Sequence, residues 1–595
     1  MKNLIVIEKY SFIIRLLLLL FKKKNTLIYY FHPYQIDQYQ EFINRVDGFE
    51  EFRLSHQIEQ EITFKANKEA LKILKDRDES SVLKFFKEIN ISDKVLIAFK
   101  KYQLNKISYQ IRMAFVSKHL NFKFSSKYKI YFFLNNFYGY QYAYEFNKNK
   151  DLKLTNFNLI NLFSRISSFV SILLFIPFII ISQIIKNGFM FKNSDPKKYK
   201  FGFHLNNNIY NRDDFSTNDI FIRSRNDFYL SKILNYDDKD SIYIFSTWNF
   251  NKDDRLRNLK ELNSRSADVG YEFNNPLNLK ILIFMFKTFF KSIIFFSKDI
   301  LLKKILLLDI FTILQIQRDI LSCEIFCSKY RIENFISRDD FSPIHIIRTI
   351  IFEKYNLKNN GLAHSICLNN YTSMLGPYVY FHTYFTQGKF YYENMYKEYW
   401  FSKNHINIGP LYGVLVDKSL NNVEKHSTFK KKYGKVKKIC FLISSFNSVT
   451  CPFDSIVISK CIKDLLKIME TDKELLMFFV PRNENSLEEF FKLFQDFKKY
   501  KNRIIIDYYY STYELMAYCD YLITEETSSS IFEGTLNPNL SILPFNTRGV
   551  IDNPLKNYSD IELFNSVNDL YKYFLNLKNS ETKFVTNNSS IKKLL

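Results

Sequence analysis

Glycine is scarce in this chain, which has only 13 glycines among its 595 residues. Neither G-x-G-x-x-G nor G-x-x-x-x-G-K-[ST] occurs, although these spacings let a glycine-rich backbone approach a phosphate closely. The shortage excludes nucleotide-binding loops built from several glycines. Hydrophobic residues make up 47% of the chain and aromatic residues 18%, which is ample for globular cores, and the length predicts two or more domains.

Cysteine is also rare, and its positions form no disulfide framework. The seven cysteines are Cys323, Cys327, Cys367, Cys440, Cys451, Cys461 and Cys519. An odd number without regular spacing favours reduced thiols and a cytoplasmic location. Cys323 and Cys327 are four residues apart in an apolar helical pattern, which favours two core positions, and no other Cys or His pair has metal-site spacing. We therefore expect no metal site.

The N-terminus lacks the pattern of a signal peptide. Glu8 and Arg15 interrupt its apolar run, and a run of three lysines at 22–24 follows where small cleavage-site residues would stand. The same residues fit a strand at 3–7, a helix at 10–21 and a strand at 26–31. This pattern predicts a βαβ opening.

The net charge of +23 arises from 84 basic and 61 acidic residues. A basic surface favours nucleic acid, anionic lipid or anionic substrates. The basic residues are spread along the chain, and no nucleic-acid-binding motif accompanies them. We therefore expect an anionic membrane surface or a phosphorylated substrate as partner, and no nucleic acid. A lysine-rich surface that serves solubility alone is the alternative.

Residues 166–185 read ISSFVSILLFIPFIIISQII, a run without charge that is long enough to span a bilayer and is flanked by Arg165 and Lys186. A single span would separate α/β segments that we expect in one compartment. A helix in the membrane interface, or a hairpin bent at Pro177, avoids this separation. A second stretch, 279–314, mixes lysines with many apolar residues. Peripheral membrane contact is expected, with a true span and buried core helices as alternatives.

Short apolar runs alternate with helical patterns from residue 332 onward, which is typical of a parallel α/β sheet. Further strands are expected earlier, at 200–205 and 241–247. The later strands are expected at 332–336, 360–367, 378–386 and 406–409, with helices at 343–355 and 389–399. The polar range 417–433 is weakly patterned and is predicted as an interdomain linker.

A second α/β series follows this linker. Its strands are expected at 436–443, 475–480, 503–508, 521–524 and 540–544. Its helices are expected at 455–470, 486–499, 512–518, 529–535 and 560–577. Such a doubly wound domain binds ligands beyond the carboxyl ends of its strands.

The stretch 521–546 reads YLITEETSSSIFEGTLNPNLSILPFN, a strand, a hydroxyl-rich loop, a short helix and a second strand. Four hydroxyl residues, Thr527, Ser528, Ser529 and Ser530, stand where the loop enters the helix. Free backbone N–H groups and hydroxyls at a helix start favour a phosphate. Capping of the helix is the alternative, and it accounts for at least one of the four.

Residues 519–533, CDYLITEETSSSIFE, resemble the SD-x-x-I-T-[DE]-x-S-S-x-x-F-[DE] pattern of GT-B surface-polysaccharide glycosyltransferases. They are also similar to the CDP-glycerol glycerophosphotransferases that build teichoic acids. The chain at 361–365, GLAHS, resembles the x-Q-H-G of these families, with Ala363 and Ser365 as departures. The segments at 384–388 and 406–410 resemble D-x-x-F-x-x-G and V-x-G-x-P.

The resemblance implies a GT-B-like α/β fold, with two Rossmann-like lobes facing a cleft and extra helical segments in the N-terminal half. The acceptor-side lobe would be 1–416 and the donor-binding domain 434–595. The implied enzyme is a metal-independent glycosyltransferase at the inner face of the plasma membrane. It would use a nucleotide sugar as substrate, no cofactor, and a glycan or lipid-linked acceptor. A glycerol- or polyol-phosphate transferase, and a non-catalytic membrane scaffold, are the alternatives.

Candidate catalytic residues are His364, Asp340 and Glu525. His364 ends an expected strand, where imidazole can act as a base, although a structural histidine is the alternative. Asp340 follows a strand and is suited either to orient an acceptor or to cap the next helix. In retaining GT-B enzymes, a glutamate pair with the spacing of Glu525 and Glu533 contacts the donor sugar and the ribose, which is the role that the resemblance implies here. A glutamate that simply starts the loop is the alternative for Glu525.

The remaining donor-binding candidates follow expected strands of the second domain. Ser444 ends the first of these strands, where a donor-facing loop is expected. Arg482 follows the second strand, where a guanidinium would neutralise a leaving diphosphate. A surface arginine in a polar turn is the alternative for Arg482.

Overall fold

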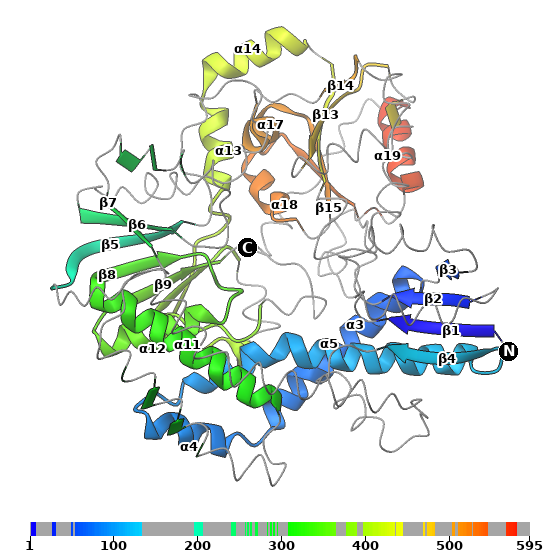
Figure 1. Cartoon of the computed structure of the whole chain (residues 1–595). Coiled ribbons are helices and arrows are strands. Elements are labelled where there is room, and N and C mark those ends of the chain that lie inside the picture. The colour runs from blue at the N-terminus through cyan, green and yellow to red at the C-terminus, as the bar shows by residue number, and fades with distance from the viewer. Residues whose placement is uncertain are drawn as a thin grey trace.

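The computed structural model describes residues 2–7, 26–30, 49–51, 54–133, 195–205, 240–245, 268–271, 307–363, 376–388, 397–434, 436–443, 468–469, 473–481, 502–505, 510–525, 528–545 and 567–579, with single positions between 256 and 294 and at 564. Within these ranges the chain forms three separate parallel sheets accompanied by helices (Figure 1). The predicted α/β class is therefore confirmed.

The first sheet lies at the N-terminus and has four parallel strands in the order β3-β2-β1-β4. These strands are β1 (Lys2–Ile7), β2 (Thr26–Tyr30), β3 (Phe49–Glu51) and β4 (Tyr128–Phe133). The strands predicted at 3–7 and 26–31 are confirmed, whereas the helix predicted at 10–21 lies outside the described residues. Range 1–416, predicted as one lobe, therefore contains this sheet in addition to a second one.

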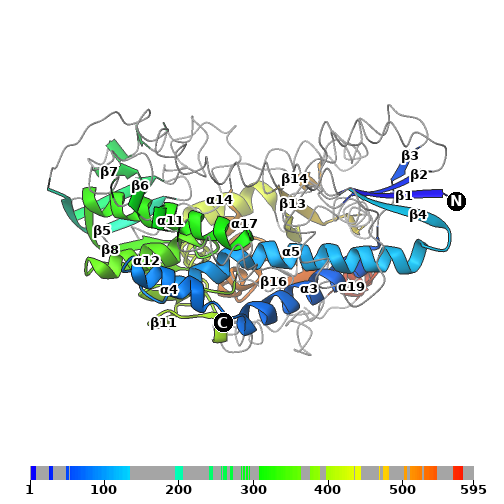
Figure 2. The same ribbon diagram turned by 60° about the horizontal axis from the view of Figure 1, so that its bottom comes forward.

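Three helices lie between β3 and β4 in the chain: α3 (His56–Asp76), α4 (Ser80–Glu88) and α5 (Val95–Phe124). The long helix α5 runs from the four-stranded sheet to α11 and α12 beside the second sheet (Figure 2). Its buried residues belong to different hydrophobic cores. Met113 and Val116 pack with β1 and β2, whereas Ala98 and Phe99 pack in the core beneath the second sheet. The helix therefore joins the two units through apolar contacts at both of its ends.

The second sheet has seven parallel strands in the order β11-β10-β9-β8-β5-β6-β7. They are β5 (Lys197–Leu205), β6 (Ser241–Phe245), β7 (Asp268–Tyr271), β8 (Tyr330–Ser337), β9 (Lys358–Leu362), β10 (Thr383–Thr386) and β11 (Asn404–Asn407). The accompanying helices are α11 (Leu307–Lys329), α12 (Ile344–Lys354) and the 3-10 helix η6 (Lys397–Tyr399). The predicted strands at 200–205, 241–247 and 332–336 and the helix at 343–355 are confirmed.

The strand predicted at 378–386 is wrong in its first half, because β10 begins only at Thr383. Tyr378 has φ of +60°, a left-handed conformation that no strand residue adopts and that is costly for a bulky side chain. Its ring is buried and lies against Tyr399 and Phe401, with centroid distances of 5.3 and 6.5 Å. Aromatic packing thus holds the backbone in a turn where the apolar sequence predicted a strand.

The third sheet has five parallel strands in the order β14-β13-β12-β15-β16. They are β12 (Lys438–Ile443), β13 (Leu476–Pro481), β14 (Ile504–Ile505), β15 (Tyr521–Glu525) and β16 (Ser541–Phe545). Its helices are α17 (Thr512–Tyr518), α18 (Ser530–Glu533), the 3-10 helix η8 (Gly534–Leu536) and α19 (Val567–Asn579). The helix at 512–518 is confirmed, and a strand occurs at each of the five predicted places, although residues 506–508 of the strand predicted at 503–508 lie outside the described residues. The range predicted as a helix at 486–499 lies outside the described residues.

The range 417–433, predicted as a linker, lies within two helices, α13 (Gly413–Leu420) and α14 (Val423–Tyr433). Phe429 of α14 is buried in the core of the five-stranded sheet, beside Phe478 and Tyr510. At Gly413, a Cβ would lie 2.8 Å from the Leu536 side chain, which would have to shift, so glycine favours the close approach of α13 to η8. The buried aromatic side chain explains why a polar, charged range folds against a core.

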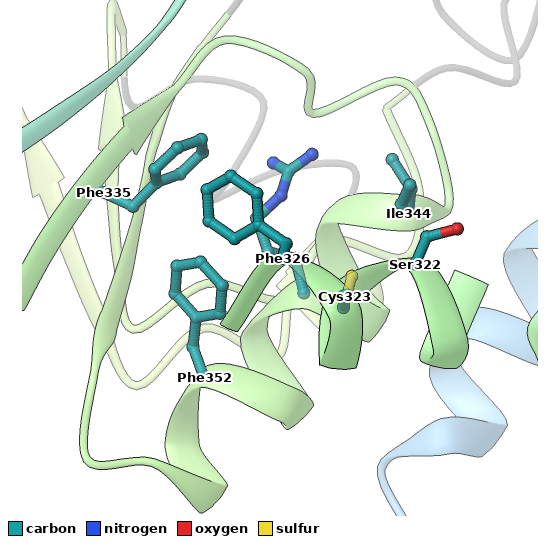
Figure 3. A pocket seen from close by; sticks show the side chains of 7 residues that line it. Ser322, Cys323, Phe326, Phe335, Ile344 and Phe352 are labelled. Carbon is teal, nitrogen blue, oxygen red and sulfur yellow. The ribbon is translucent and has the colours of Figure 1, made fainter. Parts of the chain in front are cut away.

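The core beneath the seven-stranded sheet contains a small apolar cavity between α11, α12 and β8. Phe326, Phe335 and Phe352 turn their rings toward it, and Cys323 lies on its wall (Figure 3). Cys323 and Cys327 are both buried in this core, which confirms them as core residues.

No helix in the described ranges is both long and apolar enough to cross a bilayer. The stretch 166–185 lies outside these ranges, as does most of 279–314, so their membrane contact stays a prediction.

Glu79, just before α4, is a buried carboxyl group whose nearest cation is the Lys100 ammonium at 3.7 Å. Burial raises the pKa of Glu79 to about 7, and the repulsion from Asp309 adds to the increase, while Lys100 and Arg77 oppose it. The folded state therefore keeps this proton at pH values where the unfolded state has lost it. As the pH rises from 4.5 to about 7, this group lowers the free energy of unfolding.

We expect Glu79→Gln to remove this pH dependence. The variant should be more stable than the wild type at pH 8, by up to about 3 kcal/mol, and nearly equal to it at pH 5. Thermal unfolding at pH values from 5 to 8 measures the difference, and Glu88→Gln at an exposed position of α4 is the matched control. A stability gap that does not widen with pH would contradict the assignment.

Candidate functional site

All three sheets have a strand order that marks one edge of each as a ligand site, and in the four-stranded sheet β1 lies between β2 and β4. In the five-stranded sheet, the first strand, β12, lies between the second, β13, and the fourth, β15. In the seven-stranded sheet, β5 likewise lies between β6 and β8. Connections leave in opposite directions from such a central pair, and a crevice opens beyond the carboxyl ends of its strands. We therefore expect ligand-binding and catalytic side chains at these strand ends.

At the carboxyl end of β15, the hydroxyls of Thr524, Ser528 and Ser530 form a compact cluster. The Ser530 hydroxyl lies 2.6 Å from that of Ser528 and 3.0 Å from that of Thr524. The Ser530 backbone N–H donates to the Ser528 hydroxyl at 3.3 Å. Ser530 and Thr524 are buried, whereas Ser528 is half-buried. Among the described hydroxyls of this turn, Ser528 is therefore the most accessible to a ligand.

Ser529 is the N-cap residue of α18, yet its side chain makes no capping hydrogen bond. Its hydroxyl instead donates to Glu533 Oε1 at 3.1 Å. Glu533 is buried, with 3% of its surface exposed. The capping alternative is thus wrong for Ser529. Phosphate binding by these serines and the ribose contact of Glu533 stay predictions.

Four other predicted donor-side residues lie beside the ends of described strands. Ser444 directly follows β12 and Arg482 directly follows β13. Both residues, like Thr527, lie outside the described residues. Glu525 is the last residue of β15, and its side chain is not among those described.

The carboxyl end of β8 carries charged side chains. The Arg348 guanidinium of α12 pairs with Asp339 Oδ2 at 3.0 Å and donates to the Ser337 hydroxyl at 3.3 Å. The next residue, Asp340, is only partly buried and accepts a hydrogen bond from the Tyr384 hydroxyl at 2.7 Å. Asp339 is therefore engaged in a buried ion pair, and Asp340 is the more accessible carboxylate.

Lys101 reaches this edge from α5. Its ammonium donates to the backbone carbonyls of Asp340, at 2.6 Å, and of Pro377, at 3.1 Å. Burial lowers the pKa of Lys101 to about 8, while Asp340 and Asp339 oppose the decrease. The side chain thus stays protonated at neutral pH, with three N–H donors.

His345, near the start of α12, is buried beside the same charges. Burial lowers its pKa well below the ordinary value, and Lys101 adds to the effect. Its Nε2 accepts from the Tyr380 backbone N–H at 3.4 Å, so Nδ1 carries the proton and donates to the Ser342 carbonyl. This neutral imidazole is occupied by backbone groups and is unsuited to act as a base.

The predicted base, His364, lies outside the described residues, but the residue before it is placed. Ala363 follows the carboxyl end of β9, donates its N–H to the Phe385 carbonyl at 2.8 Å, and accepts from Gln387 Nε2 at 2.9 Å. The other amide atom of Gln387, Oε1, is a buried acceptor that has no hydrogen-bond donor among the residues that the structure describes. The edge of the seven-stranded sheet thus offers hydrogen-bond acceptors after β8 and β10.

Arg338 joins the end of β8 to the start of α13. It follows β8, is 2% exposed, and places its guanidinium 5.2 Å from the ring centroid of Tyr412, beyond which α13 begins. Tyr412 is part of the hydrophobic core of the five-stranded sheet. The ends of β8 and the start of α13 are therefore held together by a cation–π contact. No cluster of His, Cys, Asp or Glu suited to a metal occurs among the residues that the structure describes.

No protein-family model and no curated protein matches the sequence. Solved structures match weakly. The wall teichoic acid polymerase TagF is 13% identical over 72% of this chain and 92% of its own, with a TM-score of 0.37. MnaA of S. aureus, solved with UDP, is 12% identical over 66% and 91%, with a TM-score of 0.37. Anabaena HepE, solved with UDP and glucose, is 10% identical over 66% and 94%, with a TM-score of 0.36. Similarities this weak assign neither a family nor a function.

Sequence patterns missed several residues at the seven-stranded edge. Arg348 had a visible signal, since it is a single arginine in the apolar helix IHIIRTIIF, where a charge requires a buried partner. Lys101 had none, because it lies among other lysines of α5 and more than 200 residues before Asp340 in the chain.

We expect Arg348→Met to destabilise the protein by about 3–5 kcal/mol, because the buried Asp339 carboxylate loses the guanidinium that pairs with it. Adding Asp339→Asn to this variant should recover part of the loss. Lys354→Met on the same helix breaks an exposed pair with Glu324 and is the control, with an expected loss below about 1 kcal/mol. Urea-induced unfolding measures all of these variants. Equal losses for Arg348→Met and Lys354→Met would refute the buried ion pair.

Proposed function

We propose that this protein is a GT-B glycosyltransferase that transfers a sugar from a nucleotide-activated donor to a cell-surface polysaccharide or lipid-linked acceptor. The five-stranded sheet would bind the donor and the seven-stranded sheet the acceptor. The observation that carries the proposal is the position of the serine turn at 528–530. It follows β15, which with β12 forms the central pair where the strand order reverses.

The two edges differ in a way that suits this division of labour. The serine turn offers hydroxyl groups, which can donate to phosphate oxygens. The other edge offers the carboxylate of Asp340 and the amide oxygen of Gln387, which accept hydrogen bonds. The hydroxyl donors of the serine turn therefore suit donor phosphates, and the acceptor oxygens of the other edge suit the hydroxyls of a sugar acceptor.

The proposed reaction is a transfer of the sugar from the diphosphate to an acceptor oxygen. Ser528, Arg482 and the backbone N–H groups around 528–530 would stabilise the departing diphosphate. Asp340 or His364 would take the proton of the acceptor hydroxyl. Fixed donors can neutralise the leaving group, so the proposal requires no metal and no cofactor. The enzyme would work at the cytoplasmic face of the plasma membrane, where lipid-linked acceptors are presented.

We expect nucleoside diphosphates and their sugar conjugates to bind the full-length protein and raise its melting temperature. Ser528→Ala should weaken this binding about ten- to a hundredfold, since one hydrogen bond to a charged phosphate is lost. Isothermal titration with UDP, CDP, GDP and their sugars measures the change. Ser419→Ala, which removes a hydroxyl donating to Leu415 within α13 of the same unit, is the matched control.

The ligand panel also separates the alternatives. Preferential binding of CDP-glycerol over nucleotide sugars would replace the glycosyltransferase with a polyol-phosphate transferase. Absence of binding to any nucleotide would overturn the enzyme proposal and favour a non-catalytic scaffold. Equal nucleotide affinities of the wild type and Ser528→Ala would indicate that the donor site lies outside the serine turn.

A further inference from the structure

Two backbone segments at the edge of the seven-stranded sheet share one buried cation. The first contains Asp340, directly after the β8 end, and the second contains Pro377, in the turn before β10. The carbonyl oxygens of both residues accept from the Lys101 ammonium, at 2.6 and 3.1 Å. Lys101 is 4% exposed. It belongs to α5, whose far end packs on the four-stranded sheet.

The backbone conformation of the turn at Pro377 depends on contacts that hold it in place. The peptide that carries the Pro377 carbonyl leads into Tyr378, whose φ of +60° is costly for a tyrosine. Such a conformation persists only where the surroundings fix it. The ring is held by Tyr399, and the carbonyl on the other side is held by Lys101. The adjacent Gly376 carbonyl accepts from Trp400 Nε1 at 3.0 Å.

The Asp340 segment depends on contacts from three elements. Its carboxylate accepts from Tyr384 of β10, its carbonyl accepts from Lys101 of α5, and the neighbouring Asp339 pairs with Arg348 of α12. The Lys101 contact holds the backbone of Asp340 itself, and it also ties this backbone to the Pro377 turn. Removal of the ammonium would leave both carbonyl groups without this donor.

We propose that Lys101 is a positioning residue, by which the helix of the N-terminal unit fixes the Asp340 carboxylate at the edge where the acceptor binds. The acceptor part of this inference rests on the proposed function. The anchoring of the two segments does not depend on it. Lys101 touches no substrate in this assignment and acts through the backbone of Asp340 and Pro377.

The test is hydrogen exchange, followed by mass spectrometry, on the full-length Lys101→Met variant. Methionine keeps the apolar stem and lacks the donors. We expect exchange to become about ten- to a hundredfold faster in peptides covering 338–342 and 376–380, and to be unchanged in α12 and β12. Lys106→Met is the matched control, because Lys106 lies on the same helix but donates to Gln315 on α11. It should leave both segments unchanged.

Lys101→Arg separates anchoring from general packing, because arginine keeps the charge and several donors. We expect it to retain most of the protection of both segments. Unchanged exchange in Lys101→Met would overturn the proposal. Faster exchange spread over the whole chain in both variants would also overturn it, since Lys101 would then be only a core residue. If Lys101→Met does not fold, Lys101→Gln replaces it, because glutamine keeps a polar end but lacks the ammonium. Faster exchange confined to the two segments then supports the proposal, and unchanged or chain-wide faster exchange contradicts it.

Steady-state kinetics distinguish a positioning role of Lys101 from a purely structural one. With a nucleotide sugar and a glycan acceptor, Lys101→Met should raise KM for the acceptor or lower kcat about tenfold or more, while the affinity for the nucleotide stays that of the wild type. A loss of nucleotide affinity in this variant would contradict a role confined to the acceptor edge. Absence of nucleotide binding by the wild type would overturn the proposed function, whereas the exchange result would still decide the anchoring by Lys101.

Discussion

The architecture depends on the burial of a single helix in two hydrophobic cores. Ala98 and Phe99 of α5 lie beneath the seven-stranded sheet, and Met113 and Val116 lie under the four-stranded one. The helix is also tied to α11 by polar contacts, since Gln103 donates to the buried Asp309, which also pairs with Arg77. Separation of α5 from either sheet would expose apolar surface to water, so we expect the two units to unfold together.

This constraint explains why the edge chemistry is assembled from distant parts of the chain. A parallel sheet aligns its strand ends at one edge, but the groups that orient those ends come from the elements around it. Arg348 arrives from α12, Tyr384 from β10 and Lys101 from α5. In the five-stranded sheet the turn after β15 is instead local, because Thr524, Ser528 and Ser530 bond to one another. One edge is thus built by tertiary contacts and the other largely by its own sequence.

The same difference decides what could be predicted. Apolar runs located the strands of the five-stranded sheet, and the serine turn was identified from its residues alone. The failures have physical causes outside local pattern. The sequence around Tyr378 predicts a strand, but this residue adopts a left-handed turn because aromatic neighbours fix its ring. The range 417–433 has the composition of a polar linker, but it packs on a core through one buried phenylalanine, Phe429. The four-stranded sheet was missed as a separate unit, since β4 pairs with β1 from 126 residues later in the chain, with Tyr128 beside Lys2. The role of Lys101 could not be predicted for the same reason, because Lys101 and Asp340 are far apart in the sequence.

The contact between Arg338 and Tyr412 has a consequence for how this chain could be divided or recombined. Tyr412, Leu415 and Val416 all belong to the core of the five-stranded sheet, ahead of the polar run that looks like the natural boundary. A chimaera joined within that run would separate the sheet from three of its core side chains. The exchangeable unit therefore begins before Tyr412. A unit that replaces it would need an aromatic ring that packs on the Arg338 guanidinium. Without such a ring, the guanidinium would lose its cation–π contact at the new interface.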